Sequence, residues 1–334
     1  MKGLLGVVLR SRRLAWAFTA LALCSASFVN AQNDFQMPAE SSRRQLDGPQ
    51  LVLTVTVTDR VGNPVPVLEK SSFTIFDERA LPEITHSDAA QMPSSIGILF
   101  DTSGSMQNPS KSYVNVKEFV KTGLRTFIQS INPLDEYFLI GFSSQAQLLS
   151  DWGREDISIL DRITDQKLKG VTALFDACYM GIEKVLQGRN KKRLIIIISD
   201  GSDNNSKRRL SELKQMIKAN SVLIYAIGVF VRDIDSSDYE LFRMAQGRLG
   251  EMAVLSGGKV FFADSPDKTK MAFEAIAREL RAQYSIGFKA ANPTGKKTWH
   301  SIKVKVTPPP NFPPDLQPLI VRSRQGYNAL SHAY

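Results

Sequence analysis

Residues that bind soft metals or form covalent cross-links are scarce in this sequence. It has two cysteines and three histidines among 334 residues. If the first 31 residues are removed, only Cys178 remains, so the chain can form no internal disulfide. Cys178 lies on the apolar face of a predicted helix, where we interpret it as a buried core residue. The histidines, at positions 86, 300 and 332, are not near the loops described below, which disfavours a zinc site.

A strong excess of one charge is also lacking. The formal net charge of +9 falls to +5 without residues 1–31, because that segment carries four basic and no acidic side chains. The remaining basic residues are scattered and form no block interleaved with aromatic residues, so we expect no nucleic-acid partner. After residue 31 no apolar run reaches the length of a membrane span. We therefore expect no stable membrane span in the mature chain.

The first residues instead have the pattern of an export signal. A basic start, an apolar stretch from Leu14 to about Leu23 and the small or apolar residues Val29-Asn30-Ala31 predict a signal peptide over residues 1–31. The apolar stretch is short for a membrane anchor, which favours cleavage. We therefore expect an exported protein with a periplasmic, cell-surface or secreted location. Residues 32–48 are polar and are predicted to form a flexible lead-in.

Two kinds of hydrophobic pattern follow. Residues 49–93 and 284–327 contain segments that alternate apolar and polar residues at period two, as half-buried strands do. Residues 94–283 instead contain short, nearly continuous apolar runs, such as Leu194 to Ile198, between amphipathic helical segments. This alternation predicts an α/β, Rossmann-like fold with a doubly wound, mainly parallel sheet flanked by helices.

The flanking segments each have too few strands to cover a core alone. We predict that they pair as one small β-sandwich built from the N- and C-terminal segments, with the α/β domain inserted between them. Two unrelated β appendages are the alternative. Residues 328–334 are predicted to form a tail.

Three loops of the α/β domain place oxygen-bearing side chains at the carboxyl ends of predicted strands, where binding sites form in open parallel sheets. The first loop reads Asp101-Thr102-Ser103-Gly104-Ser105, the second contains Thr172, and the third contains Asp200. Carboxylates, hydroxyls and water are hard ligands that suit Mg²⁺, Mn²⁺ or Ca²⁺. The alternative for the first loop is a purely structural role, in which its Asp and Ser residues only cap a helix.

This set of residues resembles the metal-ion-dependent adhesion site of von Willebrand factor type A domains. The resemblance extends over about residues 94–283 and includes the order of strands and helices. It implies that the first loop supplies three metal ligands and the other loops one each, directly or through water; these ligands are Asp101, Ser103, Ser105, Thr172 and Asp200. The flanking β segments resemble a bacterial secreted group in which this domain lies within a β-sandwich.

The resemblance implies metal-dependent binding of a protein that offers a Glu or Asp to the ion. The charges agree with this, because Asp101 and Asp200 neutralise a divalent cation and the hydroxyls add no charge. One coordination position then stays open for an anionic group of the partner. The candidates for direct contact with the partner are Met106, Gln107, Asp203 and Asn204.

Two other functions stay open. The protein could be a scaffold or assembly module of the cell envelope in which the metal only stabilises the loops. It could also be a Mg²⁺-dependent phosphohydrolase with Asp101 as nucleophile, like phosphatases of the haloacid dehalogenase type. Those enzymes carry a second Asp two residues later as general acid, where this sequence has Ser103. We find no Ser-His-Asp set either, and we therefore do not expect an enzyme.

Overall fold

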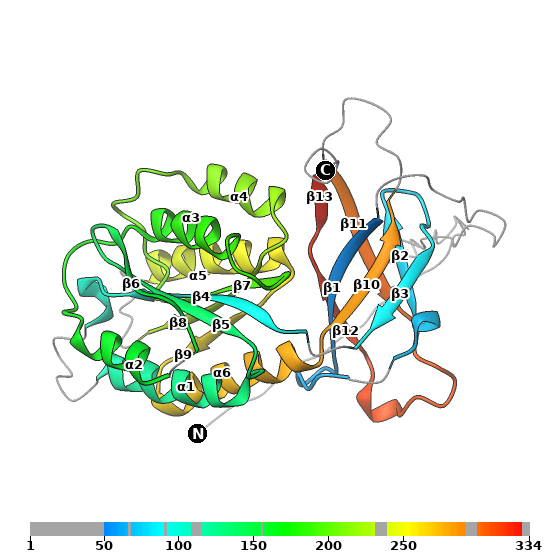
Figure 1. Ribbon diagram of the computed structural model, residues 1–334, viewed down its shortest axis with the longest axis horizontal. Coiled ribbons are helices and arrows are strands. Elements are labelled where there is room, and N and C mark those ends of the chain that lie inside the picture. Colours follow the sequence, from blue (N-terminus) through cyan, green and yellow to red (C-terminus); the bar gives the residue numbers. More distant parts are fainter. Residues whose placement is uncertain are drawn as a thin grey trace, which may run out of the picture. The chain divides into compact units, whose positions relative to one another are not determined.

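A computed structural model describes residues 50–65, 68–89, 92–107, 115–154, 156–230, 239–290 and 299–328 (Figure 1). These residues belong to one compact unit that comprises residues 42–334. The predicted signal peptide and lead-in lie outside the described residues. Within the described ranges, no helix is both long and apolar enough to cross a membrane.

A six-stranded sheet with the order β6-β5-β4-β7-β8-β9 forms the centre of the α/β part. All its strand pairs are parallel except β5 with β6, which places one antiparallel strand at an edge. Strands β4, β5 and β8 are buried along their whole length, as their continuous apolar runs predict. The strands are β4 (Ser94–Asp101), β5 (Glu136–Phe142), β6 (Ala146–Gly153), β7 (Lys192–Ser199), β8 (Leu223–Val229) and β9 (Val260–Ala263).

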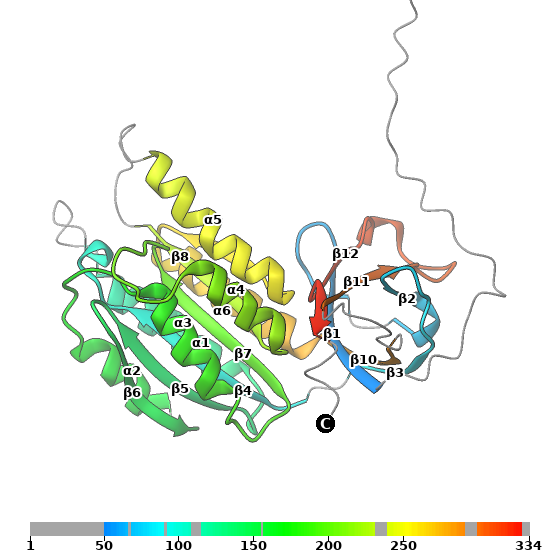
Figure 2. The same ribbon diagram turned by 90° about the horizontal axis from the view of Figure 1, so that it is seen from above.

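Helices cover both faces of this sheet (Figures 1 and 2). Helices α1, α2 and α6 pack on one face and α3, α4 and α5 on the other, each group around its own apolar core. Where α1 crosses α6, Gly123 lies directly against the ring of Phe273, and the missing side chain allows this close approach. The helices are α1 (Val116–Ser130), α2 (Asp156–Asp165), α3 (Leu174–Val185), α4 (Leu210–Ala219), α5 (Tyr239–Ser256) and α6 (Pro266–Arg281).

The flanking segments form two antiparallel sheets, with the orders β12-β1-β10-β3 and β13-β11-β2. Both sheets combine strands from before and after the α/β part, and they share one apolar core. The predicted pairing of the two segments is therefore confirmed, and the alternative of two unrelated appendages is wrong. The strands are β1 (Gln50–Thr58), β2 (Phe73–Asp77), β3 (Ile84–Asp88), β10 (Tyr284–Lys289), β11 (Trp299–Val306), β12 (Ile320–Ser323) and β13 (Gly326–Asn328). Short 3-10 turns occur at Lys70–Ser72, Gly104–Met106 and Pro314–Leu316.

Candidate metal centre

Asp101 is the last residue of β4, and its carboxylate is fully buried. Its Oδ1 accepts a hydrogen bond of 2.9 Å from the amide of Ser103. Its Oδ2 accepts one of 2.6 Å from Oγ of Ser199, the last residue of the neighbouring parallel strand β7. The side chain is therefore held by two bonds, one from its own loop and one from the adjacent strand.

The electrostatic surroundings of Asp101 favour a cation. Burial, and then the negative charge of Asp200, raises the pKa of Asp101 to about 7, against the opposing effect of its hydrogen bonds. A bound cation would counter both causes, because it stabilises the ionised carboxylates. The buried acid and its acidic neighbour thus fit the metal that the sequence predicts.

The two serines of the first loop lie side by side. Their hydroxyl oxygens, Oγ of Ser103 and Oγ of Ser105, are 2.9 Å apart. Ser103 is fully buried and Ser105 is partly exposed. Between them, the amide of Gly104 donates to the carbonyl of Gly170 at 3.0 Å. That bond ties the first loop to the second, so the loop can present both hydroxyls in one direction.

Thr172 lies in the second loop and is almost fully buried. Its amide donates to Oδ1 of Asn204 at 2.8 Å, and its carbonyl accepts from the amides of Asn204 and Asn205, each at 3.0 Å. Asn204 therefore fixes the backbone of Thr172 from the third loop. Asn204 thus connects the second loop, which contains Thr172, to the third loop.

Asp200 follows β7 directly and is partly exposed. Its Oδ1 accepts from the amide of Ser202 at 2.9 Å. The next residue, Gly201, has a φ of +82°, and a side chain there would collide with the backbone of Ala245 in α5. A glycine is thus required to turn the chain out of the sheet immediately after the acid.

The residues predicted to contact a partner differ in their placement. Met106 has 1% of its surface exposed and packs into the apolar core beside α1, so its side chain cannot reach a partner in this structure. Gln107 is exposed. Asp203 is partly buried, where Oδ1 accepts from the amide of Phe175 at 3.2 Å and from Oγ of Ser206 at 2.5 Å.

Ser199 was not identified from the sequence as part of the site. Its hydroxyl donates to Asp101 and accepts from the amide of Gly201 at 3.0 Å. The available signal was a lone hydroxyl at the end of the apolar run Leu194 to Ile198, immediately before Asp200. A serine at the start of a loop has many possible roles, and only the pairing of β4 with β7 shows this one.

The donors in these loops are carboxylates and hydroxyls. In the described part of the chain, no group of three or more His, Cys, Asp and Glu side chains is arranged to hold a metal. A cation at this site would therefore depend on the hydroxyls as well as on the two acids. All of these are oxygen donors, which suits Mg²⁺, Mn²⁺ or Ca²⁺.

Three of the solved structures to which this chain is similar have low sequence identity to it. A von Willebrand factor type A protein from Catenulispora acidiphila is 11% identical, with a TM-score of 0.47 and coverage of 79% of this chain and 72% of that one. The proximal thread matrix protein 1 of the mussel byssus, with zinc in its MIDAS motif, is 18% identical, with a TM-score of 0.47 and coverage of 64% and 50%. The PilB minor pilin from Streptococcus sanguinis is 15% identical, with a TM-score of 0.45 and coverage of 58% and 62%. This chain thus spans less than two thirds of the pilin.

The sequence itself gives the assignment. No curated protein matches it. The model of the von Willebrand factor type A domain matches residues 95–274, which is more than half of the chain and contains all three loops of the candidate metal centre. The matched range begins in β4 and ends within α6, so it coincides with the α/β part. The chain belongs to the von Willebrand factor type A domain family.

Proposed function

We propose that this protein binds another protein through a divalent cation, Mg²⁺ or alternatively Mn²⁺ or Ca²⁺. The single observation that carries the proposal is the fully buried Asp101 carboxylate, which has the second acid Asp200 in its surroundings, in a domain of this family. The proposed ligands are Asp101, Ser103, Ser105, Thr172 and Asp200. The bound cation would supply a positive centre for a Glu or Asp side chain of the partner.

The chain's own residues hold this centre in place. Asp101 and Asp200 provide two negative charges, which balance a divalent ion without exceeding its charge. Hydroxyl groups complete the ligand set without adding charge, so the ion keeps its attraction for an anionic group. Ser199 and Asn204 orient the ligands through the hydrogen bonds described above.

The surface around the three loops provides further contacts for an acidic partner. Val171, next to Thr172, is 44% exposed and offers an apolar contact. Lys207 and Arg208 are exposed in the third loop, where the carboxylate of Asp176 accepts hydrogen bonds from both backbone amides. The guanidinium of Arg208 also lies 4.3 Å from the ring centre of Tyr179. These contacts tie the part of the third loop that carries the two basic residues to α3.

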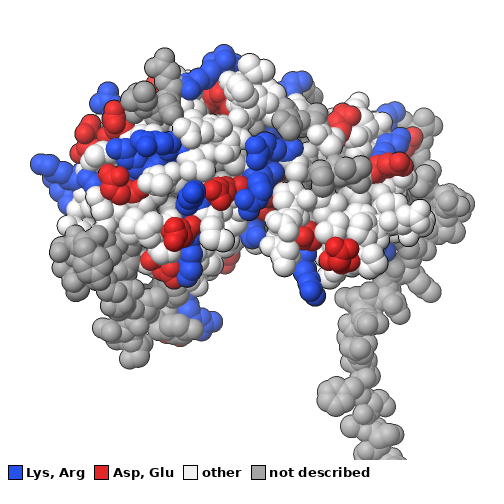
Figure 3. Space-filling model, turned by 90° about the horizontal axis from the view of Figure 1, so that it is seen from below, with Lys and Arg blue, Asp and Glu red and all other residues white. Residues whose placement is uncertain are grey.

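A nucleic acid is a poor candidate for the partner. On the face drawn in Figure 3, Lys and Arg side chains alternate with Asp and Glu side chains and form no continuous basic surface. This distribution gives no support for a nucleic-acid partner.

The proposal is tested by metal titration and by partner capture. Calorimetry with Mn²⁺ should give one site in the wild-type protein and none in Asp101→Ala. The exposed acid Asp161 on α2 provides a control, because Asp161→Ala should bind Mn²⁺ as the wild type does. Cross-linking in envelope extracts that contain Mg²⁺ should then capture a partner with the wild-type protein and with Asp161→Ala. It should capture none with Asp101→Ala. Capture that is unchanged in excess chelator would contradict the proposal.

The same experiment distinguishes the scaffold function. The hydrogen bonds among the three loops favour this second candidate, since a metal would stiffen a cluster that is already connected. In that case the metal raises the melting temperature, and Asp101→Ala retains every partner. Catalysis has less support, because position 103 offers a serine in place of a general acid and its amide already donates to Asp101.

Export is also part of the proposal. It rests on the basic and apolar pattern of residues 1–31, which predicts a signal peptide. Partner capture is therefore best carried out with periplasmic, surface and secreted fractions.

A further inference from the structure

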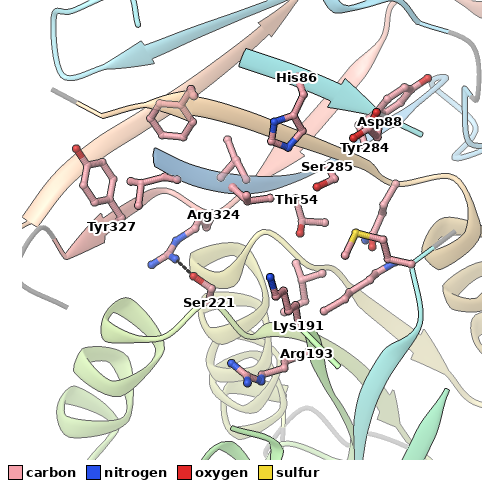
Figure 4. Close-up of a pocket in the computed structure, with 18 of the residues that line it drawn as sticks. Thr54, His86, Asp88, Lys191, Arg193, Ser221, Tyr284, Ser285, Arg324 and Tyr327 are labelled. Carbon is pink, nitrogen blue, oxygen red and sulfur yellow. Dashed lines mark hydrogen bonds between the residues drawn. The ribbon is translucent and has the colours of Figure 1, made fainter. Parts of the chain in front are cut away.

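A cavity of about 430 Å³ is present at the opposite end of β7 from the candidate metal centre. One wall is the outer face of the sheet that contains β1, β10 and β3, and the other is formed by residues around the start of β7 and of β8 (Figure 4). The volume lies within the range of small-molecule sites in proteins. With eight residues in β7, the two ends of the strand are about 23 Å apart.

The sheet wall follows from strand register. Thr54 is paired with Ser285, and Ser285 with Asp88, so these three polar side chains form one row across neighbouring strands. In the next row, Gly287 is paired with His86 and lacks a side chain, and the imidazole ring occupies the space that a Cβ would need. The ring therefore lies across the sheet and forms part of the cavity wall.

Apolar side chains form another part of the lining. Val52 is 55% exposed and Met92 is 38% exposed, although both are large hydrophobic residues. Leu223 and Phe288 lie deeper and are mostly buried. An apolar group in the cavity would cover surface that now contacts solvent, which is favourable at about 25 cal/mol per Å².

Basic residues dominate the charged part of the lining. Lys191, Lys192 and Arg193 are consecutive at the start of β7, and Arg324 comes from the segment after β12. Asp88 is the acidic residue among those that line the cavity. Within the described ranges, none of the four basic side chains forms an ion pair. Asp135 interacts electrostatically with Lys192. The positive charges of Lys191, Arg193 and Arg324 have no such partner among the described residues, so the cavity keeps a net positive charge.

Among the described residues, the hydrogen bonds of these basic side chains do not include an anionic acceptor. Nε of Arg193 is buried and has no hydrogen-bond partner among the described residues. Arg324 donates to the carbonyls of Gly326 and Lys218 and to the hydroxyl of Ser221, all uncharged groups. Partial burial lowers the pKa of Arg324 to about 10, and its hydrogen-bond partners carry no negative charge.

We propose that this cavity binds a small organic anion that has an apolar body and a carboxylate or phosphate group. The anionic group would lie against Lys191 and Arg193 and compensate their positive charges. The apolar body would lie against Val52 and Met92. Both charge and shape thus come from residues that the metal-dependent function does not use.

The test uses four probes on the mature full chain by calorimetry. Decanoate and decyl phosphate are amphipathic anions, decyltrimethylammonium has the same tail with opposite charge, and inorganic phosphate has no apolar body. We expect one site for each amphipathic anion and at least about tenfold weaker binding of the other two, since charge-assisted hydrogen bonds and apolar burial both contribute. The tighter of the two anions identifies the head group.

Variants locate the site. Lys191→Gln changes an exposed side chain and should fold normally, and it should weaken decanoate binding about tenfold, as should Arg193→Gln. Arg125→Gln removes an exposed cation from α1 and should change nothing. Mn²⁺ binding should be the same in all three variants, which separates this proposal from the metal site. Equal binding of all four probes, or unchanged decanoate binding in both cavity variants, would overturn the proposal.

Discussion

Ser199→Ala gives the sharpest test of how the candidate metal centre is held. The substitution removes the 2.6 Å hydrogen bond from the serine hydroxyl to Oδ2 of Asp101, in a position with no exposure to solvent. A hydrogen bond to a charged group contributes about 1.5–3 kcal/mol. Loss of that amount corresponds to about 10–100-fold weaker metal binding, which is also the usual effect of changing a residue that orients a metal ligand. Calorimetric titration with Mn²⁺ measures it directly.

Ser95 provides a matched control at the other end of β4. Its hydroxyl donates to Oε1 of Glu136 at 2.6 Å and accepts from the amide of Asn190 at 3.1 Å, and the residue is equally buried. Ser95→Ala should therefore lower the free energy of unfolding about as much as Ser199→Ala does, while the affinity for Mn²⁺ stays that of the wild type. If the two variants lose metal affinity equally, or Ser199→Ala loses none, the reasoning about Ser199 is refuted.

Three predictions concern the rest of the fold. Gly123→Ala should lower the free energy of unfolding by about 1–3 kcal/mol in urea, since the new methyl group collides with Phe273. Arg322→Met should lower it by about 3–5 kcal/mol, because it leaves the buried Glu279 without its 2.5 Å ion-pair partner. Burial lowers the pKa of Lys192 to about 8 from 10.5, so the unfolded chain binds more protons between these values. Stability should therefore rise from pH 8 to pH 10.5, and Lys192→Met should abolish the rise.

The sequence predicted the central strands well because both of their faces are buried. The apolar runs that became β4, β5, β7 and β8 carry no alternation, and few other structures need such runs. Strand β6 was not predicted, since it lies at the edge of the sheet and most of its residues are partly exposed. Strand β9 has only four residues, too few to show a period.

The candidate site could be predicted as far as topology determines it. The carboxyl ends of parallel strands meet at one edge, so Asp101 and Asp200 were expected there. Asp101 is the last residue of β4, and Asp200 follows the adjacent strand β7. Burial within a loop does not follow from topology. Met106 was predicted at the surface, but the short turn after Ser103 directs its side chain into the core. The supporting bond from Asn204 likewise depends on the exact path of two loops.

The position of β4 has a mechanical consequence. This strand ends in Asp101, and its other end, Ser94, continues toward β3 in the antiparallel sheets. Tension from a partner attached at Asp101 would run along β4, which is bonded on both sides to parallel strands over nearly its whole length. A load directed along the strand shears many hydrogen bonds at once. For β4 these bonds lie on both sides of the strand, whereas an edge strand has them on one side only. A partner attached at this central strand would therefore be held against a larger force than one attached at an edge strand.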